Sequence, residues 1–132
     1  MLHNLKIEPR WFKQIKDNTK RYEIRLNDRN YKVGDTLKLN EIGTDCYELR
    51  VVSSILYSTD FPKGLQENYC IMSLCTIDEV LSSYESEGFN WYQLKQIKLG
   101  LECGLDVSKY ANRGYSDSLM YSIRISLLKG EL

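Results

Sequence analysis

Apolar and polar residues alternate along the first half of the chain, and apolar residues recur at helical spacing in the second half. The alternation predicts five strands, over residues 3–7, 20–26, 36–41, 47–57 and 69–75. Pro9 opens a helix over residues 9–16, with Trp11, Phe12 and Ile15 on its apolar face, and Asn18 predicts a left-handed stop after it. One helix within a β-rich segment predicts an α+β domain over residues 1–76, built on a small curled sheet or barrel.

The most densely charged segment is the expected strand over residues 20–26 together with the loop that follows it. Residues 19–29 contain six charged side chains. Alternation places Tyr22, Ile24 and Leu26 on one face of this strand. The other face then carries a polar row formed by Arg21, Glu23, Arg25 and Asn27. Because this row is too dense and too mixed in sign for ordinary solvated surface, we take it as the candidate site.

Helical spacing replaces alternation after the last expected strand. Thr76 followed by an acidic first turn predicts the capped start of a helix. Residues 89–106 then align with residues 115–132 at an offset of 26, and each copy has a cap, an apolar stripe and a glycine stop. We expect residues 77–132 to form an α-helical extension of two repeats that pack on each other and on the first domain.

The net charge of zero hides an asymmetry along the chain. Residues 1–40 carry ten Lys or Arg against five Asp or Glu, whereas residues 41–132 carry eight against thirteen. The basic part suggests a local anionic partner. The alternative is that the two oppositely charged parts attract each other.

Apolar runs and cysteines limit the class of protein further. No apolar run reaches the length of a membrane helix, and residues 1–10 lack the apolar region of a signal peptide, so we expect a cytoplasmic protein without membrane contact. The four cysteines form no Cys-x-x-Cys pair, and His3 is the only histidine. We therefore expect reduced, mostly buried cysteines, with neither a metal site nor a cofactor.

Order, spacing and chemistry agree with one family over three stretches of the first domain. These are His3-x-Leu-Lys-Ile-x-Pro with Trp11-Phe12, Lys20-x-x-Glu-Ile-Arg-x-Asn-Asp-Arg, and Val33-Gly-Asp-x-Leu-x-Leu-x-Glu. Residues 1–76 resemble the ASCH-like domains of the PUA superfamily, and more narrowly a small bacterial and phage family without an assigned function. The resemblance implies a small β-barrel with a covering helix over a cleft that binds RNA or a modified nucleoside. The C-terminal part resembles short helical repeats of Gram-positive gut bacteria, also without an assigned function.

The favoured interpretation of the candidate site is a module that binds RNA or a nucleotide. The expected ligand contacts are Lys6, Lys20, Tyr22, Glu23, Arg25, Asp28, Arg29 and Tyr31. Arginine forks suit phosphate or a guanine edge, lysines add point charges, a carboxylate accepts from a base amine, and tyrosine rings stack on bases. The structural alternative is that Glu23 with Arg25, and Asp28 with Arg29, form ion pairs that hold a loop.

Two further interpretations stay open. Some ASCH members are amidohydrolases of acylated cytidine, and they use a Lys and a Thr on this strand and a Glu from a later one. Lys20 matches that Lys, but Glu23 occupies the place of the Thr, which is a departure from the family. The enzyme hypothesis has Lys20 as general base or nucleophile and Glu23 as its acid/base partner. The third interpretation is a protein-interaction module in residues 89–132, with an exposed aromatic patch formed by Trp91, Tyr92, Tyr110 and Tyr115.

Overall fold

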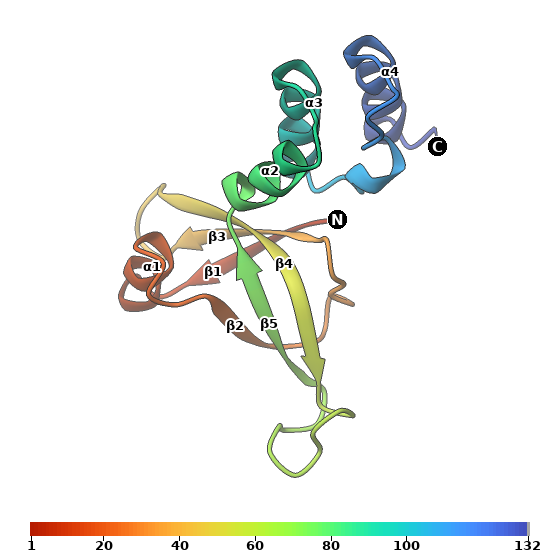
Figure 1. Ribbon diagram of the computed structural model, residues 1–132. Helices are drawn as coiled ribbons and strands as arrows, with labels where there is room; N and C mark the ends of the chain where they lie inside the picture. Colours follow the sequence, from red (N-terminus) through yellow and green to blue (C-terminus); the bar gives the residue numbers. More distant parts are fainter. Residues whose placement is uncertain (132) are drawn as a thin grey trace.

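The computed structural model describes residues 1–131 and shows a mixed α+β fold (Figure 1). In chain order, its elements are β1 (Leu2–Ile7), α1 (Pro9–Lys16), β2 (Tyr22–Leu26), β3 (Thr36–Glu41), β4 (Tyr47–Tyr57), β5 (Tyr69–Cys75), α2 (Ile77–Ser86), α3 (Trp91–Glu102), the 3-10 turn η1 (Val107–Lys109) and α4 (Asp117–Leu128). β2 begins two residues later than expected, because Lys20 N–H still donates to Gln14 O in the turn that ends α1.

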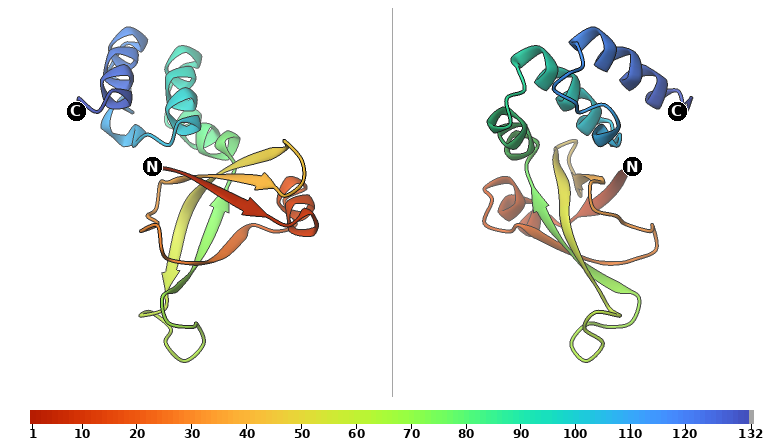
Figure 2. Two further views of the ribbon diagram at one scale, coloured as in Figure 1. Left: turned by 180° about the vertical axis from the view of Figure 1, so that it is seen from behind. Right: turned by 45° about the vertical axis from the view of Figure 1, so that its right-hand side comes forward.

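The five strands form one sheet in the order β1-β3-β4-β5-β2. β1 runs parallel to β3, and the other neighbours are antiparallel. Figure 2 shows this sheet curled into a half-barrel, in which β1 and β2 are the two edges. Arg25 and Arg29 each donate to a backbone carbonyl of β1, so the curl brings the edges within reach of side-chain bridges. The expected α+β fold on a small curled sheet is confirmed.

The hollow of the half-barrel contains the larger of two apolar cores. Its buried members are Leu5, Ile7, Phe12, Ile15, Tyr31, Leu37, Leu39, Val52, Cys70, Met72 and Leu74. They come from β1, β3, β4, β5, α1 and the loop before β3, whereas β2 supplies none. The apolar core therefore leaves the space beside β2 to polar contacts.

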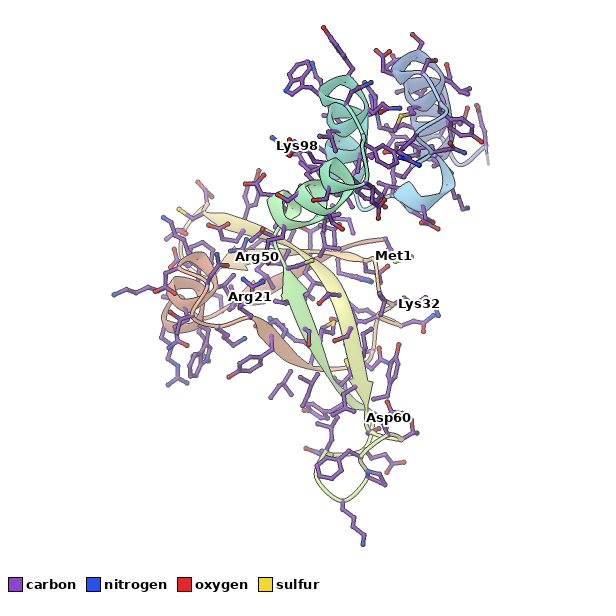
Figure 3. All side chains as sticks on the ribbon, viewed as in Figure 1. Met1, Arg21, Lys32, Arg50, Asp60 and Lys98 are labelled. Atoms are coloured by element: carbon purple, nitrogen blue, oxygen red, sulfur yellow. The ribbon has the colours of Figure 1, made fainter. Side chains whose placement is uncertain are left out.

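Helix α1 is fixed against the sheet by its apolar face and by its C-terminal end. Phe12 and Ile15 are buried in the core. The buried guanidinium of Arg50 on β4 (Figure 3) donates from Nη2 to Ile15 O at 2.8 Å, and this carbonyl also accepts from Asn18 N–H at 3.1 Å. Asn18 has a φ of 63°, which confirms the expected left-handed stop after this helix.

Helices α2 to α4 lie at one end of the half-barrel around the second apolar core (Figures 1 and 2). Its buried members are Val51, Phe89, Ile97, Leu101, Val107, Tyr110 and Met120. Thr36 Oγ1 on β3 donates to Leu101 O on α3 at 2.7 Å. Since Val51 belongs to β4, this core joins the helices to the sheet.

Helices α3 and α4 each have 12 residues and follow caps that are 26 positions apart, Asn90 and Ser116. Their burial differs, since α4 fully buries only Met120 and Arg124. Leu132, the end of the second expected copy, lies outside the described residues. The capped helices are present where the sequence predicts them, and the internal repeat stays a prediction.

All four cysteines are free, but two of them are exposed, contrary to expectation. Cys46 lies just before β4 and Cys103 is the C-terminal cap of α3, so both lie at element ends where burial is incomplete. Within residues 1–131, no helix has the length and apolarity needed to span a bilayer.

Candidate functional site

Strand β2 has its polar side chains inside the half-barrel and its apolar side chains outside. The expected alternation is confirmed: Tyr22, Ile24 and Leu26 are exposed, whereas Glu23 and Arg25 on the other face are more buried. Ile24 is 51% exposed and Glu23 only 4%. A charge in this position is costly unless it is paired, so Glu23 needs cationic partners nearby.

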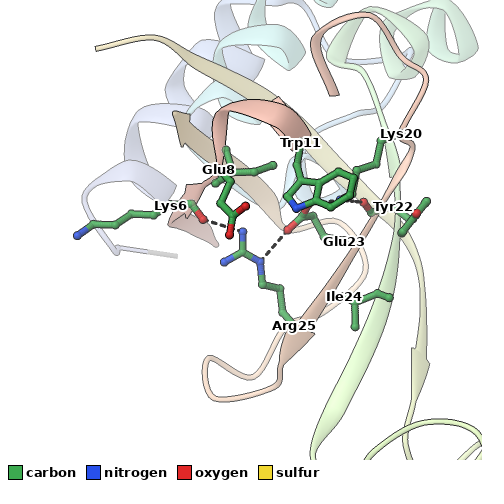
Figure 4. A pocket seen from close by; sticks show the side chains of 9 residues that line it. Lys6, Glu8, Trp11, Lys20, Tyr22, Glu23, Ile24 and Arg25 are labelled. Carbon is green, nitrogen blue, oxygen red and sulfur yellow. Dashed lines mark hydrogen bonds and ion pairs between the residues drawn. The ribbon is translucent and has the colours of Figure 1, made fainter. Parts of the chain in front are cut away.

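A pocket of about 410 Å³ opens beside this inward row, between β2, the end of β1 and the start of α1 (Figure 4). The residues that line it are Lys6, Ile7, Glu8, Trp11, Lys20, Tyr22, Glu23, Ile24 and Arg25. Five of the eight expected ligand contacts are in this set. The volume lies in the range of small-molecule sites.

Glu23 is the buried centre of an ion-pair network in this pocket. Its Oε1 accepts a hydrogen bond from Lys20 Nζ, and its Oε2 accepts one from Arg25 Nε at 2.7 Å. Lys20 Nζ also donates to Tyr22 O at 2.6 Å and lies 4.8 Å from the centre of the Tyr22 ring. Two cations around one carboxylate leave the network with a net positive charge, which favours an anionic group nearby.

Arg25 also bridges the seam between the two edges of the sheet. Its Nη2 donates to Lys6 O on β1 at 2.9 Å, and Arg29 Nη1 donates to Asn4 O on the same strand at 2.9 Å. Lys6 therefore contributes its backbone carbonyl, while its side chain extends away from Glu23 (Figure 4). Arg25 therefore both bridges the seam and lines the pocket, whereas Arg29 bridges the seam and does not line the pocket.

Three expected contact residues lie outside the pocket. Tyr31 is 1% exposed and its ring lies edge-on to His3 in the core, so it does not offer a stacking surface. Burial also raises the pKa of the Tyr31 hydroxyl. Asp28 and Arg29 are exposed in the loop after β2, and Arg29 turns to Asn4 O, so the expected Asp28–Arg29 ion pair is not formed within residues 1–131. Of the structural alternative, only the Glu23–Arg25 pair is observed.

Four lining residues were not among the expected contacts: Ile7, Glu8, Trp11 and Ile24. Trp11 is 37% exposed, so it is a wall of the pocket as well as a neighbour of the core. The Arg10 guanidinium lies 4.5 Å from the centre of the Trp11 ring. The signal in the sequence was an aromatic residue at the border of an apolar helix face.

The expected aromatic patch of the C-terminal helices is only partly exposed. Trp91 and Tyr92 are exposed, but Tyr110 is fully buried and Tyr115 packs against the second core. Tyr110 Oη donates to Gln96 O at 2.7 Å, and burial raises the pKa of this hydroxyl. Tyr110 and Tyr115 therefore belong to the core. Of the four expected rings, Trp91 and Tyr92 are exposed on the surface.

The fold and the pocket define a small α+β half-barrel domain with a charged, aromatic-walled pocket at its seam. The profile of a family described as a domain of unknown function (DUF3850) matches residues 2–74, which is more than half of the chain. The chain belongs to this family. The match contains every residue that lines the pocket and none of the helices α2 to α4. No curated protein matches the chain.

Proposed function

We propose that the pocket binds one nucleotide unit, either of single-stranded RNA or as a free nucleotide. The observation that carries the proposal is the net-positive network of Lys20, Glu23 and Arg25 beside two aromatic side chains, Trp11 and Tyr22, around one open pocket. A nucleotide joins a flat base to an anionic phosphate. Sites for it accordingly combine stacking rings with cations.

The network has hydrogen-bonding capacity left for a ligand. The Arg25 contacts within the protein engage Nε and Nη2, so its guanidinium retains N–H groups that suit a phosphate oxygen. Each oxygen of Glu23 accepts one bond, from Lys20 or from Arg25, and a carboxylate oxygen can accept a second. The exocyclic amine of a base is a suitable donor for it.

The resemblance to ASCH-like domains supports the same proposal. It implies a curled sheet with a helix beside a cleft, and the pocket of this chain lies between the curled sheet and α1. The RNA or modified-nucleoside ligands of the superfamily agree with the excess of Lys and Arg in residues 1–40.

Binding without turnover fits the pocket better than hydrolysis. The amidohydrolase that the resemblance implies needs a Glu from a later strand, and within residues 1–131 no lining residue comes from β3, β4 or β5. Lys20 Nζ is engaged by Glu23 and by Tyr22 O, and Glu23 replaces the expected Thr. The pocket thus has the Lys of the hydrolase site without its Thr and without its Glu from a later strand.

The test is a titration of Trp11 fluorescence in Trp91→Phe protein, in which Trp11 is the remaining tryptophan. The probes are a short single-stranded RNA, a DNA of the same sequence and nucleoside monophosphates, each at low and at high salt. We expect a change of Trp11 emission with at least one probe. The affinity should fall at high salt, because binding neutralises phosphate charge.

Arg25→Ala and Arg29→Ala are compared in this titration. Thermal unfolding checks that each variant folds, because Arg25→Ala also removes one partner of the buried Glu23. Each removes a guanidinium that donates to a β1 carbonyl at 2.9 Å, but only Arg25 lines the pocket. We expect Arg25→Ala to weaken binding roughly ten- to a hundredfold, since a hydrogen bond to a charged group contributes about 1.5–3 kcal/mol. Arg29→Ala should leave the affinity nearly unchanged. Equal losses in both variants, or no binding of any probe by the unsubstituted pocket, would overturn the proposal.

A further inference from the structure

A second pocket lies in a groove between α2 and α3 and shares no lining residue with the first. Its volume is about 550 Å³. The residues that line it are Asp78, Leu81, Ser82 and Glu85 of α2, and Trp91, Leu94, Lys95, Lys98, Leu99 and Glu102 of α3. Three of the lining residues are leucines, and Leu81, Leu94 and Leu99 are each half-buried. Trp91, by contrast, is 67% exposed. The groove is thus apolar at its floor, with a large aromatic side chain at one end.

The two rims of the groove carry opposite charges. Asp78 and Glu85 on α2 are seven positions apart, which places them on one face of that helix. Lys95, Lys98 and Glu102 lie on the facing rim of α3, which therefore has a net charge of about +1 against about −2 for Asp78 and Glu85. Lys98 projects from α3 on the side opposite α4 (Figure 3). Within residues 1–131, none of these five side chains takes part in an ion pair. Each rim therefore has charge available for a partner.

We propose that this groove is the interface between two copies of the chain. A two-fold axis along the groove places the acidic α2 rim of each copy opposite the basic α3 rim of the other. A surface with rims of opposite sign is then complementary to itself, whereas a groove of one sign would repel its own copy. The inference concerns a surface outside the nucleotide pocket and does not depend on that proposal.

The order of residues along the groove sets which charges meet. Asp78, Lys98 and Glu102 also line the hollow that borders Arg50 of β4, so they mark the end of the groove near the sheet. Glu85 belongs to the last turn of α2, at the other end. In the pair of copies, Asp78 therefore lies opposite Lys98, with Glu102 at the same end, and Glu85 lies opposite Lys95.

Trp91 is the expected centre of binding energy in this contact. Exposed tryptophans beside an apolar groove are typical hot spots, because they bury a large ring on association. Lys95 Nζ lies 5.7 Å from the centre of this ring and shares its rim. Association would cover Trp91 with the leucines of the other copy and shift its emission to the blue.

The test is sedimentation velocity over a range of protein concentrations, with charge-reversed variants of each rim. Lys95→Glu with Lys98→Glu makes the whole groove acidic, and Asp78→Lys with Glu85→Lys makes it basic. We expect the unsubstituted chain to dimerise. Each reversed variant alone should have a dimer affinity at least about tenfold lower, and an equal mixture of the two variants should recover dimers. The matched control is Lys63→Glu with Lys109→Glu, which makes the same charge change at exposed positions outside the groove.

Fluorescence of Trp11→Phe protein adds an independent reading, because Trp91 is then the remaining tryptophan. Its emission should shift to the blue with rising concentration in the parent protein and in the control, and not in either reversed variant alone. Thermal unfolding of each variant checks that it folds. A monomer at every concentration, or a dimer that survives both reversals, would overturn the proposal.

Discussion

Glu23 is a buried carboxylate at a position of β2 where a core residue would normally lie. Its charge is balanced by Lys20 and Arg25, and a buried charge that loses such a partner destabilises a fold by several kcal/mol. The same side chains line the pocket. The same side chains therefore stabilise the fold and line the proposed binding site. A test of the pocket accordingly needs a control variant at a residue that bridges the seam outside the pocket, such as Arg29.

Gly100 in the interior of α3 provides a test of packing at the residue scale. Helix propensity alone favours alanine over glycine by about 1 kcal/mol. A Cβ at Gly100, however, would lie 2.0 Å from Tyr110 Oη and 2.9 Å from Val107 Cγ1. We expect Gly100→Ala to lower the free energy of unfolding by about 1–3 kcal/mol, measured by urea denaturation.

Tyr110→Phe is the control for this prediction, because it removes the hydroxyl that the new Cβ would meet. We expect Gly100→Ala to cost less in the Tyr110→Phe background than in the parent protein. An equal cost in both backgrounds would contradict a clash at this hydroxyl.

At the scale of elements, the start of α2 is joined to the residue before β2 through Glu79. Thr76 and Glu79 form a capping box, in which each side chain accepts from the backbone N–H of the other. Arg21 Nη2 also donates to both carboxylate oxygens of Glu79, at 2.8 and 2.7 Å. The hydrogen bond from Arg21, followed by that from Thr76 N–H, lowers the pKa of Glu79 from 4.5 to about 2.

This shift predicts how stability depends on pH. Because the pKa of Glu79 is lower in the folded state, its contribution is complete above about pH 4.5 and is lost as the pH falls towards 2. Glu79→Gln can keep the capping box but lacks the charge. We expect it to cost about 1 kcal/mol or less at pH 7, as for exposed ion pairs, and progressively less as the pH falls through 2. Thermal unfolding of both proteins over this range measures it, and a difference that does not change with pH would contradict it.

For the whole molecule, the joint between the half-barrel and the helices decides how the two cores act together. Val51 of β4 lies in the helical core, and Thr36 bonds Leu101 O. Gly104, just after α3, lies so close to β1 that an added Cβ would be 2.4 Å from Leu2 N. The end of α3 therefore packs directly on the backbone of the first strand.

Gly104→Ala and Gly130→Ala together measure this joint. Both glycines follow a 12-residue helix with a φ of 73°, but a Cβ at Gly130 would meet no other atom of residues 1–131 within 4 Å. We expect Gly130→Ala to cost about 1 kcal/mol for the left-handed backbone. Gly104→Ala should cost about 2–4 kcal/mol, because β1 must also move away. Equal losses of unfolding free energy would contradict a tight joint.

Local signals in the sequence located most of the elements. Alternation predicted the five strands, Asn18 predicted the end of α1, and Thr76, Asn90 and Ser116 predicted the starts of the later helices. These features depend on contacts between residues close in the chain, which is why they are readable without the fold. The start of β2 was predicted two residues too early, because the backbone N–H of Lys20 donates to Gln14 O at the end of α1.

The candidate site was predictable where its residues share one strand, and not where they come from several elements. Glu23 and Arg25 follow from the alternation of β2, whereas Lys20 lies before that strand and was expected from the density of charge in residues 19–29. Tyr31 was expected at the ligand, but the side chain of a loop residue takes its direction from tertiary packing, and this one is directed into the core. Trp11 reaches the pocket only because α1 docks beside β2.

The sequence by itself determined that β2 has one apolar and one polar face, since side chains of a strand alternate whatever surrounds them. It did not determine which face lies inside. Only the tertiary structure decided that, because the curl of the sheet brings the carbonyls of β1 to Arg25, and Lys20 and Arg25 together neutralise Glu23. With those partners in place, the polar face can be buried at the seam while Tyr22, Ile24 and Leu26 stay outside.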